Sequence, residues 1–190
     1  MATHNQIWLD AVNETLGGYR RMIDAAVQQL TDDELHCRPN AETNSVAILL
    51  RHLGGNLRSR WTDFLTTDGE KPDRDRDREF EDWSASRAAL MAHFDAGWKA
   101  LEKAVSDLNE GNVNETILIR GEPHSIPLAI VRSVTHIAYH VGQIVMIART
   151  VHQGEWQWLT IAPGQSSAHN ESTWGTDQSR GVFGRSADQQ

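Results

Sequence analysis

Four long stretches of this sequence repeat their apolar residues at the spacing of an α-helix. In the first stretch, between Trp8 and Leu30, apolar side chains recur every three or four positions with polar residues between them. Such a repeat places the apolar side chains on one face of a helix, and that face packs against another element to leave water. The other three stretches span residues 46–64, 80–108 and 130–151. The sequence therefore predicts an all-α fold in which four helices form a bundle.

The connections between these helices differ in character. Residues 31–40 contain helix-capping side chains and a proline, so a turn with a short piece of helix is expected there. Residues 68–79 alternate acidic and basic side chains without a large apolar residue, which predicts a solvated loop. The third helix is expected to follow this loop directly, with Glu81 and Asp82 in its first turn, where the helix dipole favours acidic groups.

A small β-hairpin is expected before the last helix. The apolar period changes over residues 115–119 and 124–126, and the turn sequence from Arg120 to Pro123 separates these two segments. Pro127 then suits the first turn of a helix, because the N–H group that proline lacks has no helical partner at that position.

Length and composition indicate one domain with a looser end. The chain has 190 residues, of which 39% are hydrophobic, and this is enough to bury a core. Serine, glutamine and glycine become frequent after Ser166. We therefore expect a helical domain over residues 1–165 and a loose tail over residues 166–190.

Charge and hydropathy count against two classes of partner. The net charge of −8 disfavours nucleic acid, which requires clustered Lys and Arg side chains. No apolar run approaches the ~20 residues that span a bilayer, so no membrane partner is expected. The single cysteine, Cys37, cannot form an internal disulfide and is compatible with a reducing compartment. We therefore expect a cytoplasmic protein.

The predicted fourth helix contains two histidines four residues apart. His136 and His140 project from nearly one face of this helix, about 6 Å apart along its axis, so both imidazoles can reach one ion. Histidine pairs at this spacing are a common metal chelate. The same spacing also fits two ordinary histidines, one buried and hydrogen-bonded and the other at the edge of the bundle.

A third histidine favours the metal interpretation. His52 is the only histidine of the second helix and is flanked by leucines of the expected core. Three neighbouring imidazoles would repel one another if charged, whereas a divalent cation binds all three in their neutral form. We therefore predict a site of His52, His136 and His140 with a position left for water or substrate, as in catalytic sites. Zn²⁺ or Ni²⁺ suits these ligands best, and the sequence leaves Fe²⁺ and Mn²⁺ open.

Polar residues share the helix faces of the predicted ligands. Asn56, Ser59 and Arg60 follow the histidine of the second helix at helical spacing, and Gln143 follows the histidine pair. In the interior of a bundle such side chains support metal ligands or contact substrate. A solvated helix edge explains the same pattern, and for Arg60 an ion pair with Asp63 is a further alternative.

Several segments together carry a resemblance to a known family. They are Asn44–Ile48, His52–Pro72, Arg76–Phe80, His136–Ile144 and Ile161–Ser166. With the three histidines, these segments make the chain similar to the DinB/YfiT-like superfamily of metalloenzymes, and within it to a bacterial subgroup known as domain of unknown function 1572.

The resemblance implies more than the residues alone predict. It implies a bundle with up-down-down-up connectivity, often a homodimer, with a divalent metal on His52, His136 and His140. Characterised relatives include thiol S-transferases that use bacillithiol or mycothiol and a mycothiol-dependent isomerase. A low-molecular-weight thiol is therefore implied as co-substrate.

The leading hypothesis is a metal-dependent enzyme that acts on a small molecule. A bound ion lowers the pKa of a thiol or of water and so provides a nucleophile at neutral pH. Thiol-dependent S-transfer to a small electrophile is the first hypothesis, and metal-dependent hydrolysis is the second, because the same open coordination position serves both. The alternative from another class is a non-catalytic metal-binding stress-response protein whose ion stiffens the bundle.

Overall fold

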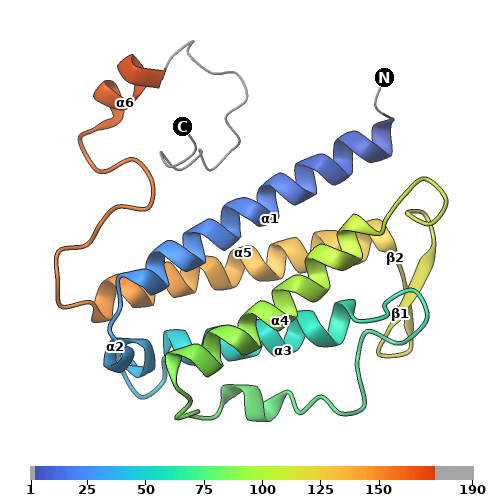
Figure 1. The fold of residues 1–190 in the computed structure, drawn as a ribbon, viewed down its shortest axis with the longest axis horizontal. Coiled ribbons are helices and arrows are strands. Elements are labelled where there is room, and N and C mark those ends of the chain that lie inside the picture. Colours follow the sequence, from blue (N-terminus) through green and yellow to red (C-terminus); the bar gives the residue numbers. More distant parts are fainter. Residues whose placement is uncertain (1–2, 174–190) are drawn as a thin grey trace.

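The structure, a computed structural model, describes residues 3–173, which are mainly helical (Figure 1). The four long helices are α1 (His4–Gln28), α3 (Val46–Trp61), α4 (Arg87–Ser106) and α5 (Ile126–Val151). The shorter elements are α2 (Asp32–His36), the 3-10 helix η1 (Asp77–Phe80), the strands β1 (Thr116–Ile119) and β2 (Glu122–Ser125), and α6 (Ser166–Thr173). The prediction of a mainly helical fold with a hairpin before the last long helix is confirmed. Within residues 3–173, no helix combines the length and the apolar content that a bilayer span requires.

Each long helix begins at a capping side chain. Backbone N–H groups three residues further on donate to the side-chain oxygens of the four caps, Thr3, Ser45, Ser86 and Ser125. A cap provides a partner for an N–H group that has none within the helix. Because Ser86 is the cap of α4, this helix begins at Arg87, and the prediction that it starts near Phe80 is wrong. The residues between η1 and this cap are not helical.

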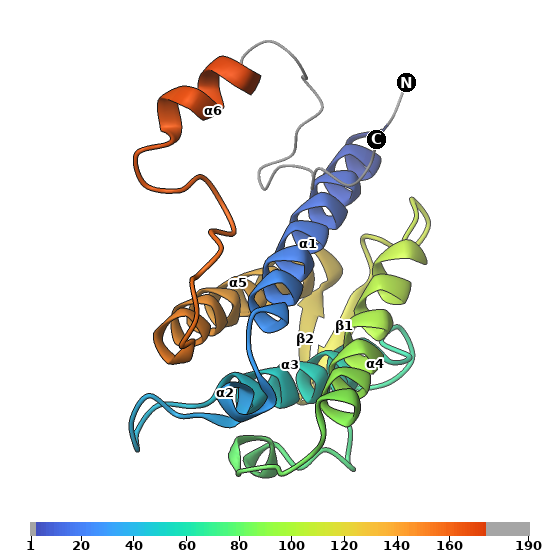
Figure 2. The ribbon, with the colours of Figure 1, turned by 60° about the vertical axis from the view of Figure 1, so that its left-hand side comes forward.

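The long helices pack around one core. Helix α3 lies along α4, α1 lies along α5, and α3 also contacts α5. Figure 1 shows α1 and α5 running in one direction and α3 and α4 in the opposite direction, and Figure 2 shows α3 and α4 side by side. The largest fully buried side chains come mainly from α3 and α4, and they include Leu49, Leu53, Phe94 and Trp98. The contact between α3 and α5 is where the predicted metal ligands lie.

Helices α3 and α4 approach closely at two glycines. A Cβ atom added at Gly97 of α4 would overlap the backbone carbonyl group of Gly54 on α3. A Cβ atom added at Gly54 would lie 2.7 Å from the ring of His93 on α4. Because the obstruction at Gly97 is backbone, a side chain there cannot be accommodated by a rotamer change alone.

We expect Gly97→Ala to destabilise the protein by about 1–3 kcal/mol, because the added methyl group forces the two helices apart. Urea denaturation followed by circular dichroism measures this change. The matched control is Gly142→Ala on α5, where an added Cβ atom meets nothing within 4 Å. Alanine there should stabilise the helix by roughly 0.5–1 kcal/mol, since glycine loses more backbone entropy on folding. Equal effects of the two substitutions would contradict the importance of the contact at Gly97.

The hairpin closes one end of the helical assembly. Strands β1 and β2 pair antiparallel, with Ile117 opposite His124, and the side chains of both residues are buried. The turn residues Arg120 and Gly121 have φ values of 57° and 72°, which matches the two-residue turns that suit hairpins. The carboxylate of Asp68 accepts hydrogen bonds of 2.8 and 2.7 Å from the N–H groups of these two residues. The connection after α3 is thereby attached to the hairpin.

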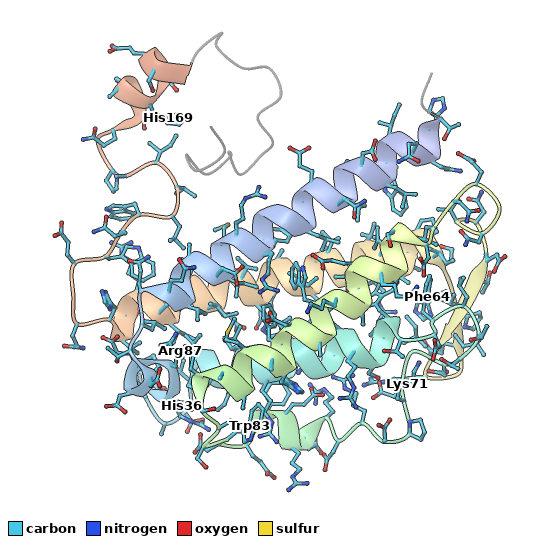
Figure 3. All side chains as sticks on the ribbon, viewed as in Figure 1. His36, Phe64, Lys71, Trp83, Arg87 and His169 are labelled. Carbon is cyan, nitrogen blue, oxygen red and sulfur yellow. The ribbon has the colours of Figure 1, made fainter. Side chains whose placement is uncertain are left out.

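The charged connection between α3 and α4 is partly buried, which corrects the prediction of a solvated loop. The side chains of Arg74 and Glu79 are only 4% and 8% exposed, and two hydrogen bonds of 2.9 Å join them. Opposite charges that pair in this way can leave water together, and the local charge pattern does not reveal it. Asp77 in the same segment is exposed. Figure 3 shows this connection beneath α3 and α4, between Lys71 and Trp83.

After α5 the chain is irregular as far as α6. The side chain of Trp156 packs against the core, whereas Trp158 is exposed and lies beneath the guanidinium group of Arg149, 4.1 Å from the centre of its ring. Helix α6, which contains His169, stands apart from the other helices in all three views. Residues 174–190, the rest of the predicted tail, lie outside the described residues, so the domain boundary stays a prediction.

Candidate metal centre

Helices α3 and α5 bring three histidine rings to one point. The Nε2 atom of His136 lies 3.1 Å from Nε2 of His52 and 3.1 Å from Nε2 of His140. One ring nitrogen of each residue lies within 4.8 Å of the other two. His136 and His140 reach this point from successive turns of α5, and His52 reaches it from α3. The metal hypothesis requires the second and the last long helix to bring their histidines together, and in this structure they do.

The spacing of these nitrogens resembles that of ligands around one ion. Nitrogen atoms bound to a tetrahedral metal at ~2.0–2.1 Å are about 3.4 Å from one another. The two contacts of 3.1 Å are close to this value. His52 and His140 are buried and His136 is half-buried, so the cluster is more open on the side of His136. Three imidazoles in this arrangement fit a divalent transition metal.

Hydrogen bonds on the far sides of two rings determine which nitrogen carries the proton. Nδ1 of His52 lies 2.8 Å from Oε2 of Glu79, and an ionised carboxylate can only accept. Nδ1 of His140 lies 2.8 Å from the side-chain oxygen Oε1 of Gln143. Both rings therefore donate from Nδ1 and direct an unprotonated Nε2 towards His136. A single proton on His136 can satisfy only one of these two lone pairs, whereas a cation at the common point would satisfy all three nitrogens.

Arg74 and Gly55 allow the carboxylate of Glu79 to lie beside Nδ1 of His52. Burial raises the pKa of Glu79, but hydrogen bonds from His52 and Arg74 outweigh it, and the pKa lies below its usual value. Glu79 is therefore ionised and accepts the proton of Nδ1 on His52 in a hydrogen bond. Gly55 of α3 leaves the necessary space, because a Cβ atom at that position would overlap the carboxylate of Glu79.

Burial keeps the rings of His136 and His140 neutral. Burial, followed by repulsion from the neighbouring histidines, lowers the pKa of His136 to about 3. Burial and then His52 lower the pKa of His140 to about 4, against a smaller opposing effect of the hydrogen bond to Gln143. Both imidazoles are uncharged at neutral pH, which is the form that binds a metal.

These low pKa values make the stability of the metal-free protein depend on pH. A histidine in the unfolded chain has a pKa of about 6.5. Below that pH the unfolded chain therefore binds protons at these two positions, whereas His136 and His140 stay neutral in the folded protein. We expect their contribution to the free energy of unfolding to be retained above about pH 6.5 and lost progressively as the pH falls towards 4. Urea denaturation in EDTA across this range measures the slope. His136→Gln should show a shallower slope, and an unchanged slope would contradict the assignment.

A cavity of about 210 Å³ opens beside His136. Its other walls come from α3, the first hairpin strand and α5, and they are Asn56, Arg60, Trp61, Ile117, Ile119, Ala129, Arg132 and Ser133. The indole N–H of Trp61 donates to the hydroxyl oxygen of Ser133 at 3.1 Å, which fixes one wall. The cavity therefore combines an apolar wall with polar groups next to a candidate metal ligand.

Residues 3–165 match the family described as "Protein of unknown function (DUF1572)". The chain belongs to the DUF1572 family. No curated protein matches this DUF1572 member. A crystal structure described as that of "the conserved protein of locus from Enterococcus faecalis" resembles it with a TM-score of 0.55 and 16% identity, over 80% of this chain and 98% of that chain. At that identity the likeness shows the fold alone.

Three of the predicted polar neighbours in this DUF1572 chain lie beside the histidines or the cavity. Gln143 accepts the hydrogen bond from His140, and Asn56 and Arg60 line the cavity. Ser59 lies elsewhere, because its hydroxyl group bonds backbone groups of residues 69 and 71 at 3.0 and 3.1 Å. Ser59 thus holds the start of the connection between α3 and α4.

The alternative that pairs Arg60 with Asp63 is wrong. Nη1 of Arg60 lies 2.9 Å from Oε2 of Glu70. Asp63 follows the end of α3, which is at Trp61, and its φ of 48° takes it off the helix. Helical spacing therefore does not apply to this pair.

Sequence reasoning missed Glu79, which orients one of the DUF1572 histidines. The alternating charges of residues 68–79 indicated a loop in water, and nothing in that pattern marks one carboxylate as buried. The available signal was Phe80, a single large apolar residue directly after the charged run. Its ring lies 4.5 Å from the ring of His52, which draws this end of the connection towards the site.

Proposed function

We propose that this protein is a metal-dependent enzyme in which His52, His136 and His140 bind one divalent ion. The observation that supports this most directly is the pair of hydrogen bonds to Glu79 and Gln143, which leaves unprotonated nitrogens directed to a common point. Zn²⁺ or Ni²⁺ is the proposed ion, because both accept imidazole ligands readily. Three protein ligands would leave a coordination position for a thiol or for water.

The proposed scaffold is a DinB/YfiT-like four-helix bundle with up-down-down-up connectivity, formed by residues 1–165 and followed by a tail. The directions of the four long helices support this connectivity (Figure 1). We also propose a homodimer in the cytoplasm. Exposed apolar side chains along α5 support the dimer, and they are Leu128, Val131, Tyr139 and Met146.

The proposed reaction is the transfer of a thiol sulfur to a small electrophile. When bound, the ion lowers the pKa of a thiol or of water, so that a nucleophile exists at neutral pH. Glu79 and Gln143 keep two ligand rings in place, because each accepts a hydrogen bond from the Nδ1–H group of one ring. The buried rings of His52 and His140 exclude water on one side, and the cavity beside His136 admits the substrate.

Two other functions use the same three histidines. A metal-dependent hydrolase would place water where the thiol is proposed. A non-catalytic metal-binding protein would use the ion only to hold α3 and α5 together. The three functions predict different results for thiol transfer, ester hydrolysis and thermal stability, each measured with and without metal.

The test is an S-transfer assay with bacillithiol, mycothiol and glutathione, each with monochlorobimane as the electrophile. We expect one thiol to react at least about tenfold faster with zinc- or nickel-loaded protein than with EDTA-treated protein, because only the loaded site generates a thiolate. His140→Ala should abolish this difference. Hydrolysis of a p-nitrophenyl ester without any thiol reaction would favour the hydrolase. Metal-dependent thermal stability without any turnover would favour the non-catalytic protein.

A further inference from the structure

We propose that the cavity beside His136 is a subsite for the carboxylate group of a small organic acid, which Arg132 binds. This inference rests on the proposed function, because the carboxylate would hold a substrate next to the metal ligands. Its support comes from the charges around the cavity rather than from the histidines themselves.

Arg132 lines the cavity without an acidic partner. Among residues 3–173, no ion pair joins its guanidinium group to a carboxylate, and its Nη1 contacts Nε2 of His124. Nδ1 of His124 donates to the backbone oxygen of Glu122 at 3.0 Å, so Nε2 is free to accept. The partner of Arg132 is thus a neutral ring. Because a guanidinium group is always protonated in proteins, an uncompensated positive charge stands at the cavity wall.

Helix geometry places the backbone of Arg132 close to one of the metal ligands. Arg132 lies one turn before His136 on α5, about 6 Å along the helix axis. Arg60 lies two turns after His52 on α3. The hairpin lies at the end of α3 and the start of α5, so both arginines are displaced from the histidines towards it (Figure 1). A ligand that contacts the metal position and extends towards the hairpin would meet them.

The other charges near the cavity are paired with one another, so they do not compensate the charge of Arg132. Glu70 pairs with Arg60 at 2.9 Å and with Arg120 at 3.0 Å, and it lies 3.5 Å from Arg74. Three guanidinium groups therefore share this carboxylate. Glu79 also pairs with Arg74, and the carboxylate of Asp68 accepts hydrogen bonds from backbone N–H groups of residues 70, 120 and 121. The carboxylates of Glu70, Glu79 and Asp68 therefore balance the three guanidinium groups. The positive charge that remains at the cavity is that of Arg132, and in a chain of net charge −8 it favours an anionic ligand.

The size and walls of the cavity indicate a small acid. Its volume of about 210 Å³ is below the ~300–1,000 Å³ of pockets for drug-sized ligands. The hydroxyl oxygen of Ser133 already accepts from Trp61, which leaves the hydroxyl hydrogen to donate to an anion. Trp61 and Ile117 supply apolar surface for a short carbon chain. Arginine binds carboxylates through two parallel hydrogen bonds, which favours this group over a neutral polar one.

The test is calorimetric titration of the zinc-loaded full chain with succinate, with its neutral analogue succinamide, and with inorganic phosphate. We expect succinate to bind at least about tenfold more tightly than succinamide, and Arg132→Gln to raise the Kd for succinate at least about tenfold without changing the zinc content. The matched control is Arg149→Gln on the same helix, which removes an equal charge away from the cavity and should leave the Kd unchanged.

Three results would overturn the proposal: equal Kd values for succinate and succinamide, no effect of Arg132→Gln, or tighter binding of phosphate than of succinate. A second titration separates this proposal from the metal hypothesis. His140→Ala without metal should still bind succinate through Arg132, and the double variant with Arg132→Gln should bind it at least about tenfold more weakly. If the wild type binds no zinc, the proposed function fails while this comparison still tests the subsite.

Discussion

Replacing His140 with Ala is expected to lower the metal content of the purified protein from about one equivalent per chain to nearly none. The ring of His140 supplies one of three nitrogens that meet at the site, and its Nε2 lies 3.1 Å from that of His136. Removing it leaves two protein ligands, and affinity for a divalent ion depends steeply on the number of ligands that the protein holds in place. Elemental analysis after dialysis against a metal buffer measures the content.

The control for this substitution is His4→Ala, which removes an exposed histidine outside the cluster and should leave the metal content unchanged. Circular dichroism should show that His140→Ala keeps its helices, because the core around the site is apolar. Retention of a full equivalent of metal by His140→Ala would exclude the three-histidine site. Loss of metal from both variants would instead indicate a ligand near the N-terminus.

Glu79→Ala is expected to have the second large effect, on both metal affinity and stability. Loss of the carboxylate frees the ring of His52 to rotate, which typically lowers metal affinity by about 10–100-fold. It also leaves the buried guanidinium group of Arg74 without the partner that it contacts through two bonds of 2.9 Å. Breaking a buried ion pair on one side costs about 3–5 kcal/mol. Zinc titration against a competing chelator measures the first quantity, and urea denaturation of the metal-free protein measures the second.

Asp77→Ala is the matched control, because Asp77 lies in the same 3-10 helix with a fully exposed side chain. It should change neither quantity. Adding Arg74→Met to Glu79→Ala should restore part of the stability, since no buried charge is then left unpaired, but it should not restore metal affinity. If Glu79→Ala binds zinc as tightly as the wild type, the role assigned to this carboxylate in orienting His52 is wrong.

The parts of the fold that could be predicted are those that local patterns determine. The apolar period of residues 130–151 predicts α5 because burial alone decides which face of that helix is apolar. Local backbone preference likewise predicts a turn within residues 120–123, although the turn itself is confined to Arg120 and Gly121 and β2 already begins at Glu122. The three histidines could be linked because two share one helix face and the third is surrounded by core leucines.

The parts that could not be predicted depend on contacts between distant residues. Glu79 is buried because Arg74 neutralises it and Gly55 makes space for it, and neither fact is visible in an alternating run of charges. The predicted start of α4 is wrong because Phe80 fits the apolar period of that helix in the sequence. In the structure, Phe80 lies outside α4 and its ring packs against that of His52. The cap at Ser86 was the local signal that decides the boundary.

The burial of Glu79 also bears on how such a centre could be moved to another protein. Two helices with histidines at the right positions would reproduce the nitrogens but not the carboxylate that orients one of them. That carboxylate comes from a separate segment, 27 residues along the chain from the ring it holds. A designer who grafts this centre therefore has to transplant three pieces of backbone, together with a glycine that accommodates the third.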